Sequence, residues 1–357
     1  MGAIKTLILF LIMLTAITSV HECGHFVVAK LLNVYVKEFS IGMGKELFSK
    51  KGKETKYTVR MLPLGGYCAF VGEEDGVGEE DPLDVPEDRT LYGAKKWKRL
   101  LILFAGTFMN IVLAIFLVAM IYLSIGKTYE APKPIISEVV VDTPAYNAGL
   151  MKDDFIKEVS LDNGYSIKLD NFSEFSDFMN IYKEGNITLK IDRNGEEKTV
   201  ELTPVYNEEN EAYVIGIRSY DYSIVEINIF NCFKYAFIYV NEMVKLIITS
   251  IIGLFRGVGY DNLSGPVGVY NITSQAVSYG FMTYVNLIAT LSLNIGLINL
   301  APIPVLDGGK IVITIIEMII RRRIPKKIEE AIMIASVALF VLLMVFATGQ
   351  DLFKLMR

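Results

Sequence analysis

The feature that most constrains this chain is a charged motif enclosed in an apolar run. Residues 21–25 read His-Glu-Cys-Gly-His, while residues 4–20 hold a single charged side chain, Lys5, and residues 26–29 are apolar again. A run of this length can form a helix that crosses a lipid bilayer. Ionisable side chains at membrane depth are costly, and they indicate a functional site.

The spacing of the motif indicates a metal site. Residues four apart share one face of a helix, so His21 and His25 can bind the same ion. Glu22 lies about 100° around the helix, beside that ion, where its carboxylate can act as a general base. Cys23 projects to the opposite side. The alternative is a helix with surface charges, and the apolar flanks argue against it.

A catalytic zinc usually has three protein ligands, and two histidines leave one missing. The chain has no other histidine, so a carboxylate or a thiolate should supply the third. The candidate is Asp307, which follows Pro302 and Pro304 near the end of an apolar run and precedes two glycines. Prolines exclude a regular helix there, and irregular backbone at membrane depth must be buried or line a cavity. Alternatively, Asp307 merely caps the following helix.

Composition predicts a membrane protein with a soluble insert. The chain has 357 residues, 52% of them hydrophobic, and its mean hydropathy is +0.40. The net charge of −5 gives no reason to expect a nucleic-acid partner. The three cysteines, Cys23, Cys68 and Cys232, are far apart in the sequence, so we do not expect a disulfide framework.

Apolar runs predict four transmembrane helices, at residues 4–32, 100–125, 281–300 and 331–347. A cleaved signal peptide is the alternative for the first, but the run lacks a small-residue cleavage site, so we expect it to be retained. Residues 230–255 are apolar but interrupted by Lys234, Asn241, Glu242 and Lys245. We expect an amphipathic helix that lies on the membrane, with a further span as the alternative.

Charges predict the orientation. Basic residues beside the first two spans, and again at 321–327, place both loops in the cytoplasm. Both termini are then outside. Within the first loop, residues 56–61 alternate like a strand, and the acidic stretch 73–88 reads as a solvated loop.

Residues 127–228 predict one small extracytoplasmic α+β domain. Strands are expected at 134–141 and 155–161, with a short helix between them in residues 143–154. Ser173 can cap a helix that runs to about residue 182. Residues 187–192 and 197–203 alternate around Asn194-Gly195, which predicts a hairpin.

The chain resembles the site-2 proteases, the intramembrane zinc metalloproteases, and within them the bacterial regulator-of-sigma-factor branch, of sigma-E type. The motifs that carry the resemblance are HECGH at 21–25, PLGGY at 63–67, AGTFMN at 105–110, SGPVG at 264–268 and NIGLINLAPIPVLDGG at 294–309. They extend over nearly the whole chain, in the order usual for the family. Thr107 stands where the family usually has proline.

The resemblance implies roles for individual residues. His21, His25 and Asp307 would bind zinc, and Glu22 would be the general acid and base. Residues 37–71 would form a membrane-associated β-region that helps to hold substrate. Four residues of an unwound stretch would contact an extended substrate strand: Asn294, Asn299, Pro302 and Pro304. The insert would be a single PDZ domain, with residues 148–150 in its typical turn.

Four regions follow from this interpretation. Residues 1–126 carry two transmembrane helices and the β-hairpin loop, residues 127–228 the PDZ-like domain, residues 229–262 the amphipathic helix, and residues 263–357 two further transmembrane helices. The expected protein is a multi-pass bacterial membrane protease whose partners are lipid and single-span membrane proteins, such as anti-sigma factors or signal-peptide remnants. The alternative is a non-enzymatic scaffold or metal transporter with a peptide-binding PDZ domain, but the other spans are nearly free of charge, unlike a transport path.

Overall fold

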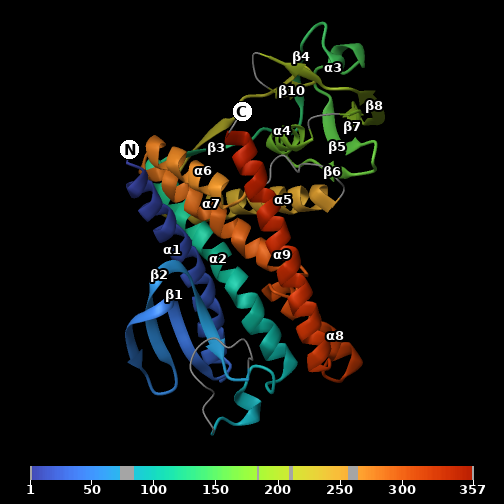
Figure 1. Cartoon of the computed structure of the whole chain (residues 1–357). Coiled ribbons are helices and arrows are strands. Elements are labelled where there is room, and N and C mark those ends of the chain that lie inside the picture. Colours follow the sequence, from blue (N-terminus) through green and yellow to red (C-terminus); the bar gives the residue numbers. More distant parts are fainter. Residues whose placement is uncertain (1, 73–83, 183–184, 209–211, 256–263, 356–357) are drawn as a thin grey trace. The chain divides into compact units, whose positions relative to one another are not determined.

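The computed structural model describes residues 2–72, 84–182, 185–208, 212–255 and 264–355 (Figure 1). The chain forms two compact units. The first combines Met1–Ile121 with Ser264–Arg357, and the second is Tyr122–Leu263. Most of the acidic stretch at 73–88 lies outside the described residues.

Long helices form where the apolar runs predict them. They are α1 (Ala3–Leu31), α2 (Lys96–Ile125), α7 (Phe281–Asn299) and α9 (Lys326–Leu355). In the second unit, α5 (Cys232–Phe255) is also long and apolar enough to cross a bilayer, which makes five such helices among the described residues. The chain therefore has several helices that could span a membrane, and four spans remain a prediction.

One helix was not predicted. The sequence of residues 265–268, Gly-Pro-Val-Gly, predicts a break in the chain, but α6 (Pro266–Tyr279) begins inside it, with proline in its first turn. Proline is favourable there because it lacks only an N–H that has no partner within the helix. The carboxylate of Asp351, on α9, accepts a hydrogen bond from the Gly268 N–H at 2.7 Å. In Figure 1, α6 lies beside α1, α7 and α9, and it contacts each of these three helices.

The break after α7 forms as predicted. Residues 300–306 are irregular, and α8 (Asp307–Ile320) begins directly after them. The expectation that Asn294 and Asn299 lie in the unwound stretch is wrong, since both belong to α7. Nothing in residues 294–299 interrupts helical hydrogen bonding; the prolines lie at 302 and 304, and only the residues around them leave the helix.

The first loop forms two long, bent strands, β1 (Val36–Lys51) and β2 (Lys56–Phe70), which extend well beyond the predicted strand. Ser40 pairs with Tyr67 on one side and with Thr58 on the other, so the first half of β1 lies between the two halves of β2. Buried side chains of α1, α2 and β2 pack together there: Ala29, Phe70 and Ile102. The short helix η1 (Glu87–Arg89) precedes α2. This packing holds the end of β2 against α1.

The second unit contains the predicted α+β domain. Its four-stranded sheet has the order β6-β5-β7-β8, all neighbours antiparallel. The bounds are β5 (Phe155–Leu161), β6 (Ser166–Lys168), β7 (Ile187–Arg193) and β8 (Glu196–Leu202). Helices α3 (Pro144–Asn147) and α4 (Phe172–Ile181) contribute to one buried cluster with this sheet.

Short strand pairs complete the unit. The pairs are β4 (Ile136–Val139) with β11 (Ile217–Ser219), β9 (Val205–Asn207) with β10 (Ala212–Val214), and β3 (Lys127–Glu130) with β12 (Ser223–Glu226). The hairpin between β7 and β8 is confirmed, because Asn194 and Gly195 have φ angles of 55° and 88°. Positive φ at both positions is what a two-residue hairpin turn requires.

One predicted cap is wrong. The helix cap is Asn171, not Ser173: the Asn171 side chain accepts a hydrogen bond from the Glu174 N–H at 3.1 Å. Asparagine caps helices as well as serine does. α4 therefore begins at Phe172, two residues before a helix capped by Ser173 would begin.

Candidate metal centre

Three donor atoms converge between α1 and the first residue of α8. The Nε2 atoms of His21 and His25 lie 3.0 Å and 3.2 Å from one oxygen of Asp307, and 3.2 Å from each other. Both histidines are buried, and the Asp307 side chain is 16% exposed. The structure thus brings together the three residues that the sequence predicts as ligands, across 286 positions of chain.

The orientation of His25 is fixed from α2. Its Nδ1–H donates to the carbonyl oxygen of Ile102 at 2.7 Å, which leaves Nε2 pointing at the cluster. This arrangement is typical of histidine ligands, whose second nitrogen is held by a carbonyl or a carboxylate. The sequence did not reveal Ile102, because a backbone acceptor leaves no residue-type signal.

Close contact with α2 forms one wall of the cluster. A Cβ atom added to Gly106 would lie 2.5 Å from His25 Nε2 and 2.7 Å from His21 Nε2, so only glycine fits. The next residue, Thr107, donates its hydroxyl to the carbonyl oxygen of Gly296 on α7 at 2.9 Å. Thr107 therefore links α2 to α7.

The LDGG sequence fits Asp307 into the break after α7. A Cβ atom on Gly308 would collide with the backbone of Leu300 and Ala301. The absence of a side chain lets α8 start directly against the irregular segment. Asp307 is the first residue of α8, and its helix is capped from Leu306, whose side chain makes no capping bond. The capping alternative for Asp307 is therefore not needed to explain the residue.

Glu22 lies beside the cluster and is held by β2. Its Oε2 accepts a hydrogen bond from the Cys68 N–H at 3.0 Å. A cavity of about 180 Å³ adjoins it, lined by Glu22, His25, Lys37, Tyr67, Cys68, Ala69, Phe70, Leu103, Asp307 and Lys310. The family resemblance implies a β-region in residues 37–71 that helps to hold substrate. It could not identify Cys68 as the strand residue that contacts Glu22.

The four residues expected to bind substrate lie in different settings. Pro302 and Pro304 are in the irregular segment that leads to Asp307. The Nδ2 atom of Asn299 lies 3.3 Å from His21 Nε2, which places this residue at the cluster itself. Asn294, Pro302 and Pro304 are not among the described residues that line the cavity beside Glu22.

The donor set fits a divalent zinc ion. Two imidazole nitrogens and one carboxylate oxygen, all within 4.8 Å of one another, are the donor types of many catalytic zinc sites. Among the described residues, the group of histidine, cysteine and acidic side chains that could hold a metal together is His21, His25 and Asp307.

Comparison with known proteins gives the same chemistry. The model of peptidase family M50 matches residues 9–343. Three relatives, each named "putative zinc metalloprotease", cover nearly the full chain. The protein of Clostridium perfringens is 36% identical over 97% of this chain and 98% of its own length. Those of Clostridium acetobutylicum and Fusobacterium nucleatum are 33% and 32% identical, over 93% and 98% of this chain and 93% and 99% of their own.

Proposed function

The chain belongs to peptidase family M50 and is a zinc metalloprotease of the multi-pass membrane type, and from this premise we propose that it cleaves single-span membrane proteins within or beside the bilayer. The observation that carries the proposal is the cluster of His21, His25 and Asp307 with Glu22 beside it. His21 and His25 lie within an apolar helix. A segment of 28 residues in it, Ile4–Leu31, is long and apolar enough to cross a membrane.

In this proposal His21, His25 and Asp307 hold the zinc ion. Zinc at this position would acidify a water molecule and polarise the carbonyl group of the scissile bond. The imidazole of His25 keeps its orientation because Ile102 accepts its Nδ1 proton. Asp307 balances part of the ionic charge, which is important in an apolar setting where an uncompensated charge is costly.

Glu22 acts as the general base and then as the general acid. Its carboxylate accepts the proton of the attacking water and passes it to the amine that leaves. The Cys68 N–H holds one carboxylate oxygen at 3.0 Å, so the other oxygen is available to the reacting groups. A positioned base of this kind contributes roughly 10²- to 10⁴-fold to the rate.

The substrate binds along the last segment of β2. A helix conceals its carbonyl groups in hydrogen bonds, so the substrate must unwind into an extended strand before cleavage. Residues 67–70 line the cavity beside Glu22, and this part of β2 pairs with β1 on one side only, among the strand pairs described. An extended segment can add to such an edge through main-chain hydrogen bonds.

The second unit selects substrates in this proposal. It is a PDZ-like domain on the extracytoplasmic side, where it would meet the outer part of a substrate and admit substrates whose outer domain has been shortened. The loop that contains β1 and β2 is cytoplasmic in this proposal, because basic residues lie beside the first two spans. Anti-sigma factors and signal-peptide remnants are the expected substrate types.

The experiment is cleavage of candidate single-span proteins by the purified chain in lipid. Wild type should release a fragment cut within or beside the span, and Glu22→Gln should reduce the rate at least about 100-fold while zinc stays bound. Glu201→Gln, which changes an exposed acid on β8, is the matched control. Cleavage at the wild-type rate by Glu22→Gln would refute the role of Glu22.

A further inference from the structure

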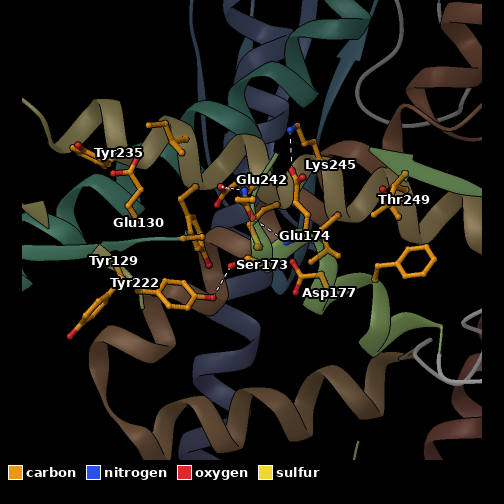
Figure 2. A pocket seen from close by; sticks show the side chains of 18 of the residues that line it. Tyr129, Glu130, Ser173, Glu174, Asp177, Tyr222, Tyr235, Glu242, Lys245 and Thr249 are labelled. Carbon is orange, nitrogen blue, oxygen red and sulfur yellow. Dashed lines mark hydrogen bonds and ion pairs between the residues drawn. The ribbon is translucent and has the colours of Figure 1, made fainter. Parts of the chain in front are cut away.

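A large cavity lies wholly inside the second unit, between the α+β domain and α5 (Figure 2). Its volume is about 680 Å³, within the range of sites that bind small molecules or several peptide residues. Most of its lining comes from α4, α5 and β3. Ile167 and Lys168 of β6, Tyr122 of α2 and Tyr222, which precedes β12, also contribute. None of its lining residues belongs to the metal centre, so the cavity needs a separate explanation.

The polar part of the lining is acidic. It contains Glu130, Glu174, Asp177 and Glu242, against two lysines, Lys168 and Lys245. Lys245 is already engaged, because it forms ion pairs with Asp170 and, at 3.0 Å, with Glu174. Glu242 accepts a hydrogen bond from the neutral amide of Asn171 at 3.0 Å. The carboxylates therefore outnumber the cations that face them.

Asp177 is the half-buried carboxylate of this lining that lacks a partner among the described residues. No hydrogen bond or ion pair reaches it from the described part of the chain, and it is half-buried. Burial, and then the neighbouring Glu174, raise the pKa of Asp177 above its ordinary value. A cation bound beside Asp177 would relieve both effects, since it would stabilise the charged carboxylate.

The apolar part of the lining is rich in tyrosine: Tyr122, Tyr129, Tyr222, Tyr235 and Tyr239. Figure 2 shows Tyr129, Tyr222 and Tyr235 toward one end of the cavity, next to Glu130, with Glu174, Asp177 and Glu242 further along. The Tyr222 hydroxyl is 2.9 Å from Ser173 Oγ, which fixes its ring. Aromatic faces combined with carboxylates are the surroundings in which proteins bind ammonium and guanidinium groups.

The wall of β3 indicates that the bound group belongs to a peptide. Four consecutive residues, 128–131, line the cavity, so this wall includes main chain as well as side chains. β3 pairs with β12 and with no other strand among those described. A strand with one open edge can accept an extended peptide through its N–H and C=O groups.

We propose that this cavity binds an extended peptide segment and holds one lysine or arginine side chain of it between the tyrosines and the carboxylates of Asp177 and Glu242. The segment adds to the edge of β3, and the basic side chain enters the acidic interior. The inference does not rest on the proposed function, since all the residues it uses lie between 122 and 263. The second unit would then recognise peptide segments that contain lysine or arginine, whether or not the peptide is cleaved afterwards.

The test uses the full-length chain with Glu22→Gln, in lipid nanodiscs, so that bound peptide is not hydrolysed. The probes are four pools of fluorescent heptapeptides with mixed flanks and a fixed central lysine, arginine, glutamine or glutamate. Fluorescence anisotropy should show the lysine and arginine pools bound roughly tenfold more tightly than the glutamine pool. The glutamate pool should bind most weakly.

Two variants locate the preference. Asp177→Asn and Glu242→Gln keep the shape of each side chain, and each should reduce the preference for basic pools to less than about threefold, because one carboxylate is lost. Glu201→Gln removes an exposed acid on β8 outside the cavity and should leave the preference unchanged. Thermal unfolding of each variant checks that the second unit is intact.

Three results would overturn the inference. Equal binding of the lysine and glutamine pools would show that the cavity does not select a cation. A preference that persists in both Asp177→Asn and Glu242→Gln would place the binding elsewhere. A preference that vanishes when the nanodiscs contain phosphatidylethanolamine, but not with lipids lacking an amine, would identify a lipid headgroup as the occupant.

Discussion

At the scale of single residues, the metal centre depends on backbone atoms and on a glycine, whose contacts cannot be recognised in the sequence. Gly106 is the strongest case, because its Cα faces both imidazoles. Gly106→Ala should push the His21 and His25 rings apart and lower the zinc content of the purified protein several-fold, measured by plasma mass spectrometry. Gly349→Ala is the control, since an added Cβ there meets nothing within 4 Å. Normal zinc content in Gly106→Ala would mean that the helices separate easily at this point.

The same scale shows what sequence reasoning can reach at the site. Spacing alone places His21, Glu22 and His25, and the two prolines with Asp307 indicate the third donor. Ile102, Cys68 and Gly106 could not be predicted. Two of these act through backbone atoms, and the third acts by lacking a side chain. Residue type carries no signal for such contacts until α1, α2 and β2 are placed together.

At the scale of elements, a buried ion pair joins α2 to α8. Arg99 Nη1 lies 3.2 Å from Glu317 Oε2, and both side chains are 4% exposed or less. Glu317 also accepts a hydrogen bond from the Ile324 N–H at 3.1 Å, and Arg99 lies 4.2 Å from the centre of the Tyr92 ring. Gly106 is on α2 and Asp307 is on α8, so the pair connects the two helices that meet at the metal centre.

Breaking this pair should be costly, because it would leave a buried charge without its partner. Arg99→Met is expected to lower the free energy of unfolding by about 3–5 kcal/mol, measured by denaturant titration in detergent. The double variant Arg99→Met with Glu317→Met should recover much of that loss. Equal losses in the single and double variants would show that the two residues act separately. Arg218→Met, which breaks an exposed pair with Glu138, should have little effect.

The elements themselves were largely predictable where hydrophobic periodicity is strong. The apolar runs located α1, α2, α7 and α9, and Asn194-Gly195 located the β7–β8 hairpin. The helix α6 was missed because Pro266 and Gly268 read as a break, although proline is favourable at the start of a helix. The lengths of β1 and β2 were underestimated, since bent strands that pair on both sides do not alternate regularly.

At the scale of the whole molecule, α5 decides how many helices cross the membrane. It is apolar enough to span, yet its Glu242 and Lys245 contact Asn171, Asp170 and Glu174 of the α+β domain. Polar side chains that are used in this way favour the prediction that α5 lies along the membrane, since a spanning α5 would place these contacts in lipid. The four predicted spans then return both termini to the same side.

Labelling of single cysteines tests this arrangement. In a background without Cys23, Cys68 and Cys232, cysteines at positions 51 and 322 should be shielded from an impermeant thiol reagent in intact cells, and one at position 194 should react. The charge asymmetry of the loops is the reason. Cells made permeable to the reagent provide the control for reactivity. The opposite pattern would reverse the orientation, and labelling at position 322 but not at 51 would indicate a fifth span.

Removal of residues 127–228 tests the division of labour between the units. The predicted zinc ligands lie outside this segment, so zinc should stay bound and peptide hydrolysis should continue. Discrimination between full-length and pre-trimmed substrates should be lost, which comparison of the two cleavage rates would show. Unchanged selectivity for the trimmed form would exclude a filter role for the domain.

The most direct test of the account is the zinc content of Asp307→Ala. His21 and His25 can be recognised as ligands from their motif alone, whereas Asp307 joins them only if α8 begins where the structure places it. Wild type should contain one zinc ion per chain, and Asp307→Ala should lose most of it at the same protein concentration, while Asp84→Ala, at an exposed position of the same unit, should retain it. Full zinc occupancy in Asp307→Ala would contradict the account, because another residue would then be the third ligand.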